Sequence, residues 1–462
     1  MNTTLQILPF KLSHTEQEIF LENTQKIEFC SGDFVLISGA NGSGKSHLLQ
    51  LIKGIIPQII DLNHATRNAI VYNNSSIENL PELAQNEIAY LGQIPYTGFV
   101  IDHVLQDLWF SSRGLHSMDH NAFEKDILRI LSAFDILQLI DRKISSLSSG
   151  EQQLINVTRI LLQQPQVLLL DEFGEYLSNN NLQKVIDFVK DDLENMIVIV
   201  ADHNPSEIIP YITQQIYIQD SQIKLRNFDL DCYMKNTKFP LLISNNDSSS
   251  IESTLTIKDL SFTWNNELPA SVLFSTLNIN LSSKQIIGIY GNNSSGKSTL
   301  LQILVRQLSP SFGEIELFNK SIKNISKNTY FKNVHVLFTN SILHFFEVNI
   351  ENELKYLVFS PEFILTKINL IDKKHLHFSA LSNGEQKRLA LATVIFSKAK
   401  LILLDDPFLG QDQENRIALE ELIHEIRVTL QTSFIIVSNK ISLLPQKLHQ
   451  IYSLTDHTIK PL

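Results

Sequence analysis

Short apolar runs that end at acidic residues recur in both halves of the chain. Val167–Leu170 precedes Asp171, and Leu401–Leu404 precedes Asp405. Runs of four residues without polar interruption are typical of buried strands. In α/β sheets, ligands bind at the carboxyl ends of such strands. The pattern predicts two α/β domains whose acidic residues lie at a ligand-binding edge, and Val198–Ala201 is a further strand of this kind.

A polar segment separates the two halves. Residues 245–250 read NNDSSS, which is poor in apolar residues and typical of a linker, and a strand pattern resumes near Ser253. Before it, Gln215–Gln219 and Gln222–Leu225 have strand patterns. The predicted organisation is a first domain over 1–225, a linker over 226–250 and a second domain over 251–462. Each domain should hold a helical insert, over 95–145 and 345–378.

One phosphate-loop sequence occurs twice. Residues 39–46 read GANGSGKS and residues 291–298 read GNNSSGKS, and both fit G-x-x-x-x-G-K-[ST]. Glycines let backbone N–H groups surround phosphate oxygens, the lysine adds a positive charge, and the final hydroxyl is a ligand for Mg²⁺. The candidate nucleotide-binding residues here are Gly39, Asn41, Gly42, Ser43, Gly44, Lys45, Ser46, His47, Gly291, Asn292, Asn293, Ser294, Ser295, Gly296, Lys297, Ser298 and Thr299.

A second motif follows each loop at a fixed distance from the acidic strand end. It reads LSSGEQQ from Leu147 and LSNGEQK from Leu381; Asp171 and Asp405 each lie 24 residues after that leucine. Equal spacing indicates one supersecondary unit used twice. The pattern Ser-x-x-Glu predicts capping boxes at helix starts, where free N–H groups suit a phosphate. The candidate residues are Ser148, Gly150, Ser382 and Gly384.

Together these motifs resemble the ATP-binding-cassette (ABC) ATPases over nearly the whole chain. The resemblance implies two tandem P-loop ATPase domains that pair head to tail and use ATP and Mg²⁺. It implies metal contacts from Ser46, Gln93, Asp171, Ser298 and Asp405. It also implies catalytic roles for Gln93, for Glu172 as the general base and for His203 as a γ-phosphate contact. A glutamate, Glu151 or Glu385, stands where the family usually has glutamine.

The second half departs from the family pattern. Thr339 stands in the place of the glutamine, Asp406 in that of the catalytic glutamate and Asn439 in that of the histidine. The resemblance implies that Ser382, Gly384 and Asp412 complete the first site in trans. Ser148, Gly150 and Ser178 would complete the second, with Ser178 replacing the family's aspartate. All departures thus fall on one composite site, which is expected to bind ATP and hydrolyse it poorly.

Two apolar features have alternative interpretations. Trp264 resembles the aromatic residue that stacks on adenine, but a role in the core is equally consistent, and its ungapped counterpart is Leu12. Apolar residues at helical spacing near position 100 suit either a groove for a membrane partner or the core of the helical insert, which is the favoured interpretation. These residues are Phe99, Val100, Val104, Leu105, Leu108 and Trp109.

Composition narrows the setting. Across 462 residues the net charge is −11, which disfavours nonspecific binding to nucleic acid, and two cysteines form no disulfide framework. The sequence shows no membrane span, no signal segment and no long heptad run. We therefore expect a protein of the reducing cytoplasm with no nucleic-acid partner, and the importer resemblance described next implies that it is bound peripherally to the cytoplasmic face of the cell membrane.

Three segments resemble energy-coupling-factor (ECF) importers of vitamins and metals. They are GIIPQI over 54–59, FFEVNIENEL over 345–354 and DDPFLGQD over 405–412. The resemblance implies integral membrane transport subunits as partners, together with a separate substrate-binding membrane subunit. The alternatives are a general ABC importer ATPase and a soluble twin ATPase that acts on ribosomes or as a regulatory factor. The residues after Gln93, IPYTGFV, depart from the ECF pattern.

Overall fold

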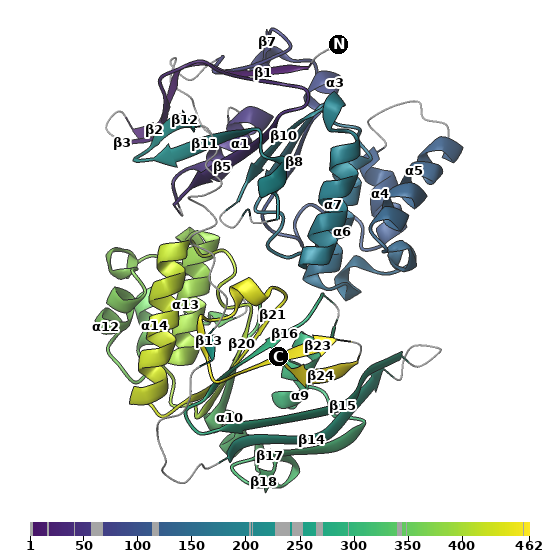
Figure 1. Ribbon diagram of the computed structural model, residues 1–462. Coiled ribbons are helices and arrows are strands. Elements are labelled where there is room, and N and C mark those ends of the chain that lie inside the picture. The colour runs from purple at the N-terminus through teal and green to yellow at the C-terminus, as the bar shows by residue number, and fades with distance from the viewer. Residues whose placement is uncertain are drawn as a thin grey trace. The chain divides into compact units, whose positions relative to one another are not determined.

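The computed structural model divides the chain into two compact units, Met1–Met234 and Lys235–Leu462. Each unit has a large sheet covered by helices (Figure 1). Within the predicted linker, the described residues are Arg226 and strand β13 (Leu241–Leu242). The structure describes residues 3–15, 18–40, 42–56, 68–112, 120–202, 205, 207–226, 241–242, 253–264, 271–293, 295–339, 344–347, 349–455 and 457–462.

The first unit is built on an eight-stranded sheet, in which the strands β11, β5, β10, β9 and β8 pair in parallel. Its strand order is β2 (Phe10–Thr15), β3 (Glu18–Asn23), β12 (Gln222–Arg226), β11 (Gln214–Gln219), β5 (Phe34–Gly39), β10 (Ile197–Ala201), β9 (Val167–Asp171) and β8 (Ile88–Leu91). A smaller sheet has the order β4 (Ile27–Cys30), β1 (Thr4–Ile7), β6 (Ile70–Tyr72) and β7 (Ser75–Ser76).

The second unit repeats the parallel arrangement, here in strands β23, β16, β21, β20 and β19. Its sheet has the order β18 (Lys320–Ser321), β17 (Phe312–Leu317), β14 (Ser253–Trp264), β15 (Ser271–Ser282), β24 (Thr458–Pro461), β23 (Gln450–Thr455), β16 (Ile286–Tyr290), β21 (Ser433–Ser438), β20 (Leu401–Asp405) and β19 (Val334–Leu337). Strand β13 pairs separately with β22 (Lys447–Leu448).

The helices that cover the sheets follow one another in the same order along the chain in both units. In the first unit they are α1 (Lys45–Lys53), α3 (Glu82–Gln85), α4 (Val104–Ser112), α5 (His120–Ala133), α6 (Ser149–Leu161) and α7 (Asn179–Asp191). In the second they are α9 (Lys297–Leu304), α10 (Lys327–Asn333), α11 (Ile350–Leu354), α12 (Pro361–Lys367), α13 (Asn383–Ile395) and α14 (Gln413–Thr429). No helix in these described ranges is both long enough and apolar enough to span a bilayer.

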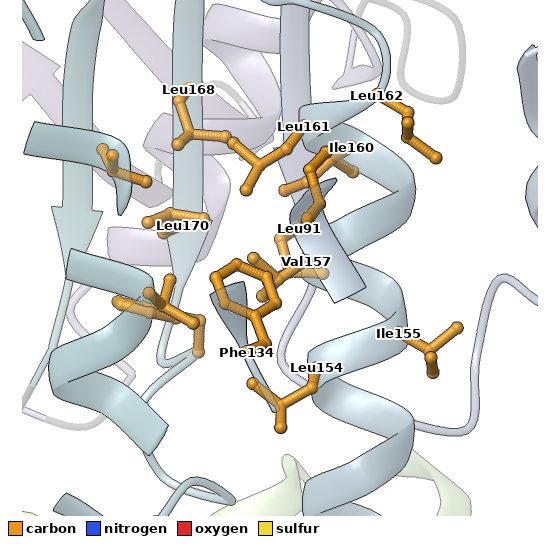
Figure 2. Close-up of a cluster of buried hydrophobic side chains, with 14 of the residues drawn as sticks. Leu91, Phe134, Leu154, Ile155, Val157, Ile160, Leu161, Leu162, Leu168 and Leu170 are labelled. Carbon is orange, nitrogen blue, oxygen red and sulfur yellow. The ribbon is translucent and has the colours of Figure 1, made fainter. Parts of the chain in front are cut away.

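The apolar strand β9 is buried because both of its faces are covered. Leu168 and Leu170 belong to the core formed with α4 to α7, and Figure 2 shows them facing Leu161 and Phe134. Val167 and Leu169 belong to a second core that includes α1. Strand β20 divides its residues between two cores in the same way. Burial on both faces explains why these strands are continuous apolar runs rather than alternating ones.

The secondary structure confirms the predicted elements. Asp171 and Asp405 are the last residues of β9 and β20. The strands predicted near residues 198, 215 and 222 are β10, β11 and β12. Both predicted inserts contain helices. Within the first insert, Val104 and Leu108 are fully buried, so the core interpretation is correct for these two residues. Val100, by contrast, is 66% exposed.

Candidate nucleotide-binding sites

The first phosphate loop connects β5 to α1. The loop turns at Gly44, whose φ of 101° lies in the left-handed region that glycine adopts without strain. The Lys45 ammonium donates hydrogen bonds to the carbonyls of Gly39 and Ala40, both at 3.0 Å, which hold it over the loop. Ser43 carries a buried hydroxyl without a hydrogen-bond partner among the described residues. A buried polar atom of this kind is costly unless a ligand satisfies it.

The second loop, between β16 and α9, has the same construction. Lys297 donates to the carbonyls of Gly291 and Asn292, at 2.8 and 2.7 Å. Burial lowers the pKa of its ammonium. The Ser295 hydroxyl, at the position of Ser43, is likewise buried and unpartnered among the described residues. Both loops therefore present a lysine and an unsatisfied hydroxyl where a phosphate would lie.

Asp171, at the end of β9, meets the first phosphate loop. It hydrogen-bonds to Ser46 and accepts from the Tyr90 hydroxyl at 3.1 Å. Burial, together with the nearby Glu172 carboxylate, raises the pKa of Asp171 to about 6. Its second oxygen, Oδ1, is buried and has no hydrogen-bond partner among the described residues. A serine hydroxyl beside an unsatisfied carboxylate oxygen fits Mg²⁺, which takes one or two protein ligands and fills the rest with water and phosphate oxygens.

Glu172 is held beside Asp171 by two contacts. Its backbone N–H donates to the Ala201 carbonyl of β10 at 2.8 Å, and its carboxylate accepts from the side-chain amide of Gln93. Its φ of 48° is left-handed, which is uncommon for a residue other than glycine. Asp406 follows β20 with a φ of 47° and donates its N–H to Val437 at 3.0 Å. The same strained turn therefore follows both acidic strand ends.

Hydroxyl groups replace the amide contact in the second unit. Strand register places Thr339 at the position of Gln93, because Leu91 pairs with Leu170 and Leu337 with Leu404. Thr339 hydrogen-bonds to Asp405, which also accepts from Ser298 at 3.0 Å. Burial, followed by the neighbouring Asp406 carboxylate, raises the pKa of Asp405 to about 6.

Asp406 is bound by a hydroxyl that the sequence analysis missed. The Ser438 hydroxyl donates to its Oδ1 at 2.6 Å. Asn439, in the place of His203, donates its amide to Asn293 of the phosphate loop at 3.3 Å. Tyr90 was also missed, although an ionisable residue in the strand before Gln93 was a usable signal. Neither contact follows from the motifs, because each joins residues on different strands.

The motifs LSSGEQQ and LSNGEQK, which we call the signature motifs, form the predicted capping boxes. Ser148 caps α6 and accepts from the Glu151 N–H at 3.3 Å, while Glu151 accepts from the Ser148 N–H at 2.8 Å. Ser382 and Glu385 make the same exchange at α13, at 3.4 and 3.0 Å. Gly150 and Gly384 lie in the first turns of these helices. Each unit thus presents a helix N-terminus, with its partial positive charge, beside the motif.

The remaining predicted residues have varied positions. Asp412 and Ser178 are the N-caps of α14 and α7, and His47 and Thr299 lie in the first turns of α1 and α9. Trp264 is partly buried and packs edge-on against Phe262, with ring centroids 5.0 Å apart. This contact is consistent with the core interpretation. His203, Asn41 and Ser294 lie outside the described residues.

Comparison with known proteins identifies the family of the chain. The sequence profile described as "ABC transporter" matches residues 23–174 and 274–409, more than half of the chain. A Bacillus cereus protein named "Putative ABC transporter ATP-binding protein" is 25% identical, over 86% of this chain and 80% of its own. The Bacillus subtilis "Putative HMP/thiamine import ATP-binding protein YkoD" is 23% identical, over 92% of this chain and 84% of its own.

Solved structures share the fold. A chain from "Model of ribosome-bound archaeal Pelota and ABCE1" has a TM-score of 0.67 at 18% identity, covering 93% of this chain and 74% of that one. "RNase-L Inhibitor" has a TM-score of 0.59 at 18% identity, covering 91% and 83%. Identities this low show a common fold alone. Two phosphate loops, two capped signature helices and the profile match together establish that the chain belongs to the ABC transporter family, as an ATPase with two tandem domains that uses ATP and Mg²⁺.

Proposed function

We propose that the chain is the ATP-hydrolysing subunit of a membrane importer of the ECF type, which couples ATP hydrolysis to uptake of a small solute such as a vitamin or metal ion. The ECF-like segments of the sequence and the import function in the name of the Bacillus subtilis relative support this proposal. Its partners would be integral membrane transport subunits and a separate substrate-binding membrane subunit. It would work at the cytoplasmic face of the cell membrane.

One structural observation carries the proposal. In each helical insert a carboxylate binds the two backbone N–H groups that lie seven and six residues before it. Asp107 accepts from Val100 and Ile101 at 2.8 and 3.0 Å, and Glu353 accepts from Phe346 and Glu347 at 3.0 and 2.8 Å. We call each carboxylate and its two N–H donors a carboxylate clamp. Asp107 is buried, and because a buried carboxylate needs hydrogen-bond donors, its two hydrogen bonds hold the preceding backbone in place.

Each clamp displays an apolar side chain. Val100 is 66% exposed and Phe346 is 89% exposed, at equivalent positions of the two clamps. Three residues after each acid stands an exposed aromatic residue, Phe110 or Tyr356. Exposure of large apolar residues at the same place in two units is more typical of an interaction site than of scattered surface residues. A short amphipathic helix of a membrane subunit is the partner that this surface suits.

A direct test compares aspartate substitutions on this surface. Val100→Asp combined with Phe346→Asp should move the chain out of the membrane fraction of the cells that produce it, with soluble ATPase activity retained. Phe312→Asp is the matched control, because Phe312 is 71% exposed on β17, a strand outside both helical inserts. The proposal fails if the doubly substituted chain stays with membranes.

The second candidate is a soluble twin ATPase that acts on ribosomes. The fold shared with the ribosome-bound ABCE1 chain favours it, although an identity of 18% carries no function. The net charge of −11 opposes it, because binding to RNA phosphates depends on lysine and arginine. Sedimentation of the unsubstituted chain with ribosomes at moderate salt, without membrane association, would establish this alternative.

Unequal hydrolysis is the second part of the proposed function. Glu172 would polarise the attacking water at the first phosphate loop, aided by Gln93 and His203. Mg²⁺ held through Ser46 and Asp171 would neutralise phosphate charge there. The family resemblance assigns Ser382, Gly384 and Asp412 to this site in trans. At the second loop the acid is Asp406, whose side chain is one methylene shorter than that of Glu172 and whose Oδ1 is held by the Ser438 hydroxyl, so its carboxylate would reach the attacking water less well.

A further inference from the structure

A buried polar contact ties the signature motif of the second unit to the loop that precedes α14. Gln411 donates its side-chain amide to the Gly384 carbonyl at 3.0 Å. The guanidinium of Arg388 donates to the side-chain amide oxygen Oε1 of Gln411 at 3.2 Å, and to the backbone carbonyl of Ile368 at 3.1 Å. Both side chains are buried, with 6% of Arg388 and 7% of Gln411 exposed. We call Arg388 and Gln411 the signature clamp.

In the described part of the first unit, apolar side chains take the place of the signature clamp. A constant offset of 234 residues, which relates Leu147 to Leu381 and Asp171 to Asp405, places Leu154 at the position of Arg388 and Leu177 at that of Gln411. Both leucines are buried members of the apolar core. The same place in the fold is therefore filled by dispersion contacts in one unit and by directed hydrogen bonds in the other.

Burying a guanidinium and an amide is costly compared with burying two leucines. Burial lowers the pKa of Arg388, and the nearby carboxylates of Glu385 and Asp412 act in the opposite direction. The three hydrogen bonds offset this cost, and hydrogen bonds fix orientation more narrowly than apolar packing does. The signature clamp fixes Gly384, which lies in the signature motif, and Gln411 itself, which directly precedes Asp412.

We infer that Arg388 and Gln411 are positioning residues that hold the second signature motif and Asp412 in register for ATP hydrolysis. The inference rests on the proposed function, in which Ser382, Gly384 and Asp412 act on the nucleotide at the first phosphate loop. The leucine pair of the first unit would then reflect a signature that acts on the poorly hydrolysing site, where less accurate placement suffices.

The substitution Gln411→Glu distinguishes a role of Gln411 in positioning the signature motif from a role in the stability of the fold. A glutamate keeps the acceptor for Arg388, and the charged pair is stronger than the neutral one, but it cannot donate to the Gly384 carbonyl. Steady-state kcat should fall at least tenfold, with KM for ATP changed less than threefold and the unfolding midpoint close to that of the unsubstituted chain. Gln411→Leu and Arg388→Leu, which copy the first unit, should lower kcat in the same way.

Two controls make the test decisive. Leu177→Met, at the matching position of the first unit, should leave kcat within twofold, because volume-conserving apolar substitutions are tolerated. Hydrogen exchange of the full chain should show faster exchange near the second signature motif in Gln411→Glu. Faster exchange with an unchanged kcat, or an unchanged exchange rate, overturns the inference. Failure of Glu172→Gln to abolish turnover would instead overturn the proposed function, whatever Gln411→Glu does.

Discussion

The side-chain amide of Gln93 donates a hydrogen bond to the carboxylate of Glu172, 79 residues further along the chain. In the second unit Thr339 stands at the position of Gln93 and hydrogen-bonds to Asp405. Asp406 accepts a hydrogen bond from the Ser438 hydroxyl instead. The two units therefore hold their second acidic residue through different partners. This difference is the structural basis for expecting unequal hydrolysis.

Glu172→Gln should nearly abolish ATP turnover. Loss of a positioned base lowers rates by about 10²–10⁴-fold. The glutamine keeps the shape of the side chain and a hydrogen-bond acceptor for Gln93, so ATP binding should persist. The measurement is steady-state ATPase activity, with membrane subunits present if turnover requires them.

Asp406→Asn is the matched comparison. Its loss should stay under about tenfold, because its carboxylate is not expected to act as an effective base. Equal losses for the two substitutions, or a larger loss for Asp406→Asn, would contradict the prediction that the second site is the poorly hydrolysing one.

The chain should bind two ATP molecules. With hydrolysis blocked by Glu172→Gln, equilibrium dialysis should give a stoichiometry of two, and Lys45→Ala or Lys297→Ala should each lower it to one, since each ammonium serves one loop. Lys258→Ala, whose side chain is 55% exposed in a surface ion pair, should leave it at two. One nucleotide in the parent chain, or a strong preference for GTP, contradicts the prediction.

Two glycines with the same backbone conformation should differ in their tolerance of alanine. Gly32 has a φ of 98° and open space where a Cβ atom would lie, whereas at Gly313, with a φ of 96°, a Cβ would lie 2.5 Å from the Asp259 carbonyl oxygen. Gly32→Ala should cost about 1–2 kcal/mol of stability through the left-handed backbone. Gly313→Ala should cost roughly 1–3 kcal/mol more, because the neighbouring strand must move.

The measurement for these glycines is denaturant unfolding followed by hydrogen exchange in peptides of the unit concerned, since the chain has two units that need not unfold together. Equal destabilisation by the two substitutions would contradict the prediction, because the strand at Asp259 would then move without lowering the free energy of unfolding.

His449 should contribute less to the stability of the second unit in mild acid than at neutral pH. Burial, followed by the charge of Arg427, lowers the pKa of His449 to about 4, and its Nδ1 accepts the Ile286 N–H at 3.0 Å. The unfolded chain, with a histidine pKa near about 6.5, binds a proton first as the pH falls. The contribution of His449 is therefore present above about pH 6.5 and is lost as the pH falls toward about 4.

The check is the denaturant midpoint of the second unit at about pH 7 and about pH 5, on either side of the unfolded histidine pKa. His449→Asn keeps an acceptor near Ile286 and cannot be protonated, so it should reduce the difference between the two midpoints. His375→Asn, on a side chain that is 74% exposed, should leave the difference unchanged. An equal pH dependence in the parent chain and in His449→Asn would contradict the prediction.

The sequence by itself determined the local features of this protein. The phosphate loops, the capping boxes and the strands that end at Asp171 and Asp405 are each encoded within a few consecutive residues. Glycine placement, side-chain capping and apolar run length act over that short range, so pattern alone predicts them. The constant spacing between motifs then predicts that the unit occurs twice.

Only the tertiary structure decided which side chains meet across strands and helices. Tyr90 reaches Asp171 over 81 residues, and Ser438 reaches Asp406 from the neighbouring strand. The exposure of Val100 beside the buried Val104 depends on how α4 packs, although both are valines in the same short segment. Contacts of this kind are set by strand register and by which helix face the core covers. These depend on the whole fold, and no short stretch of sequence contains them.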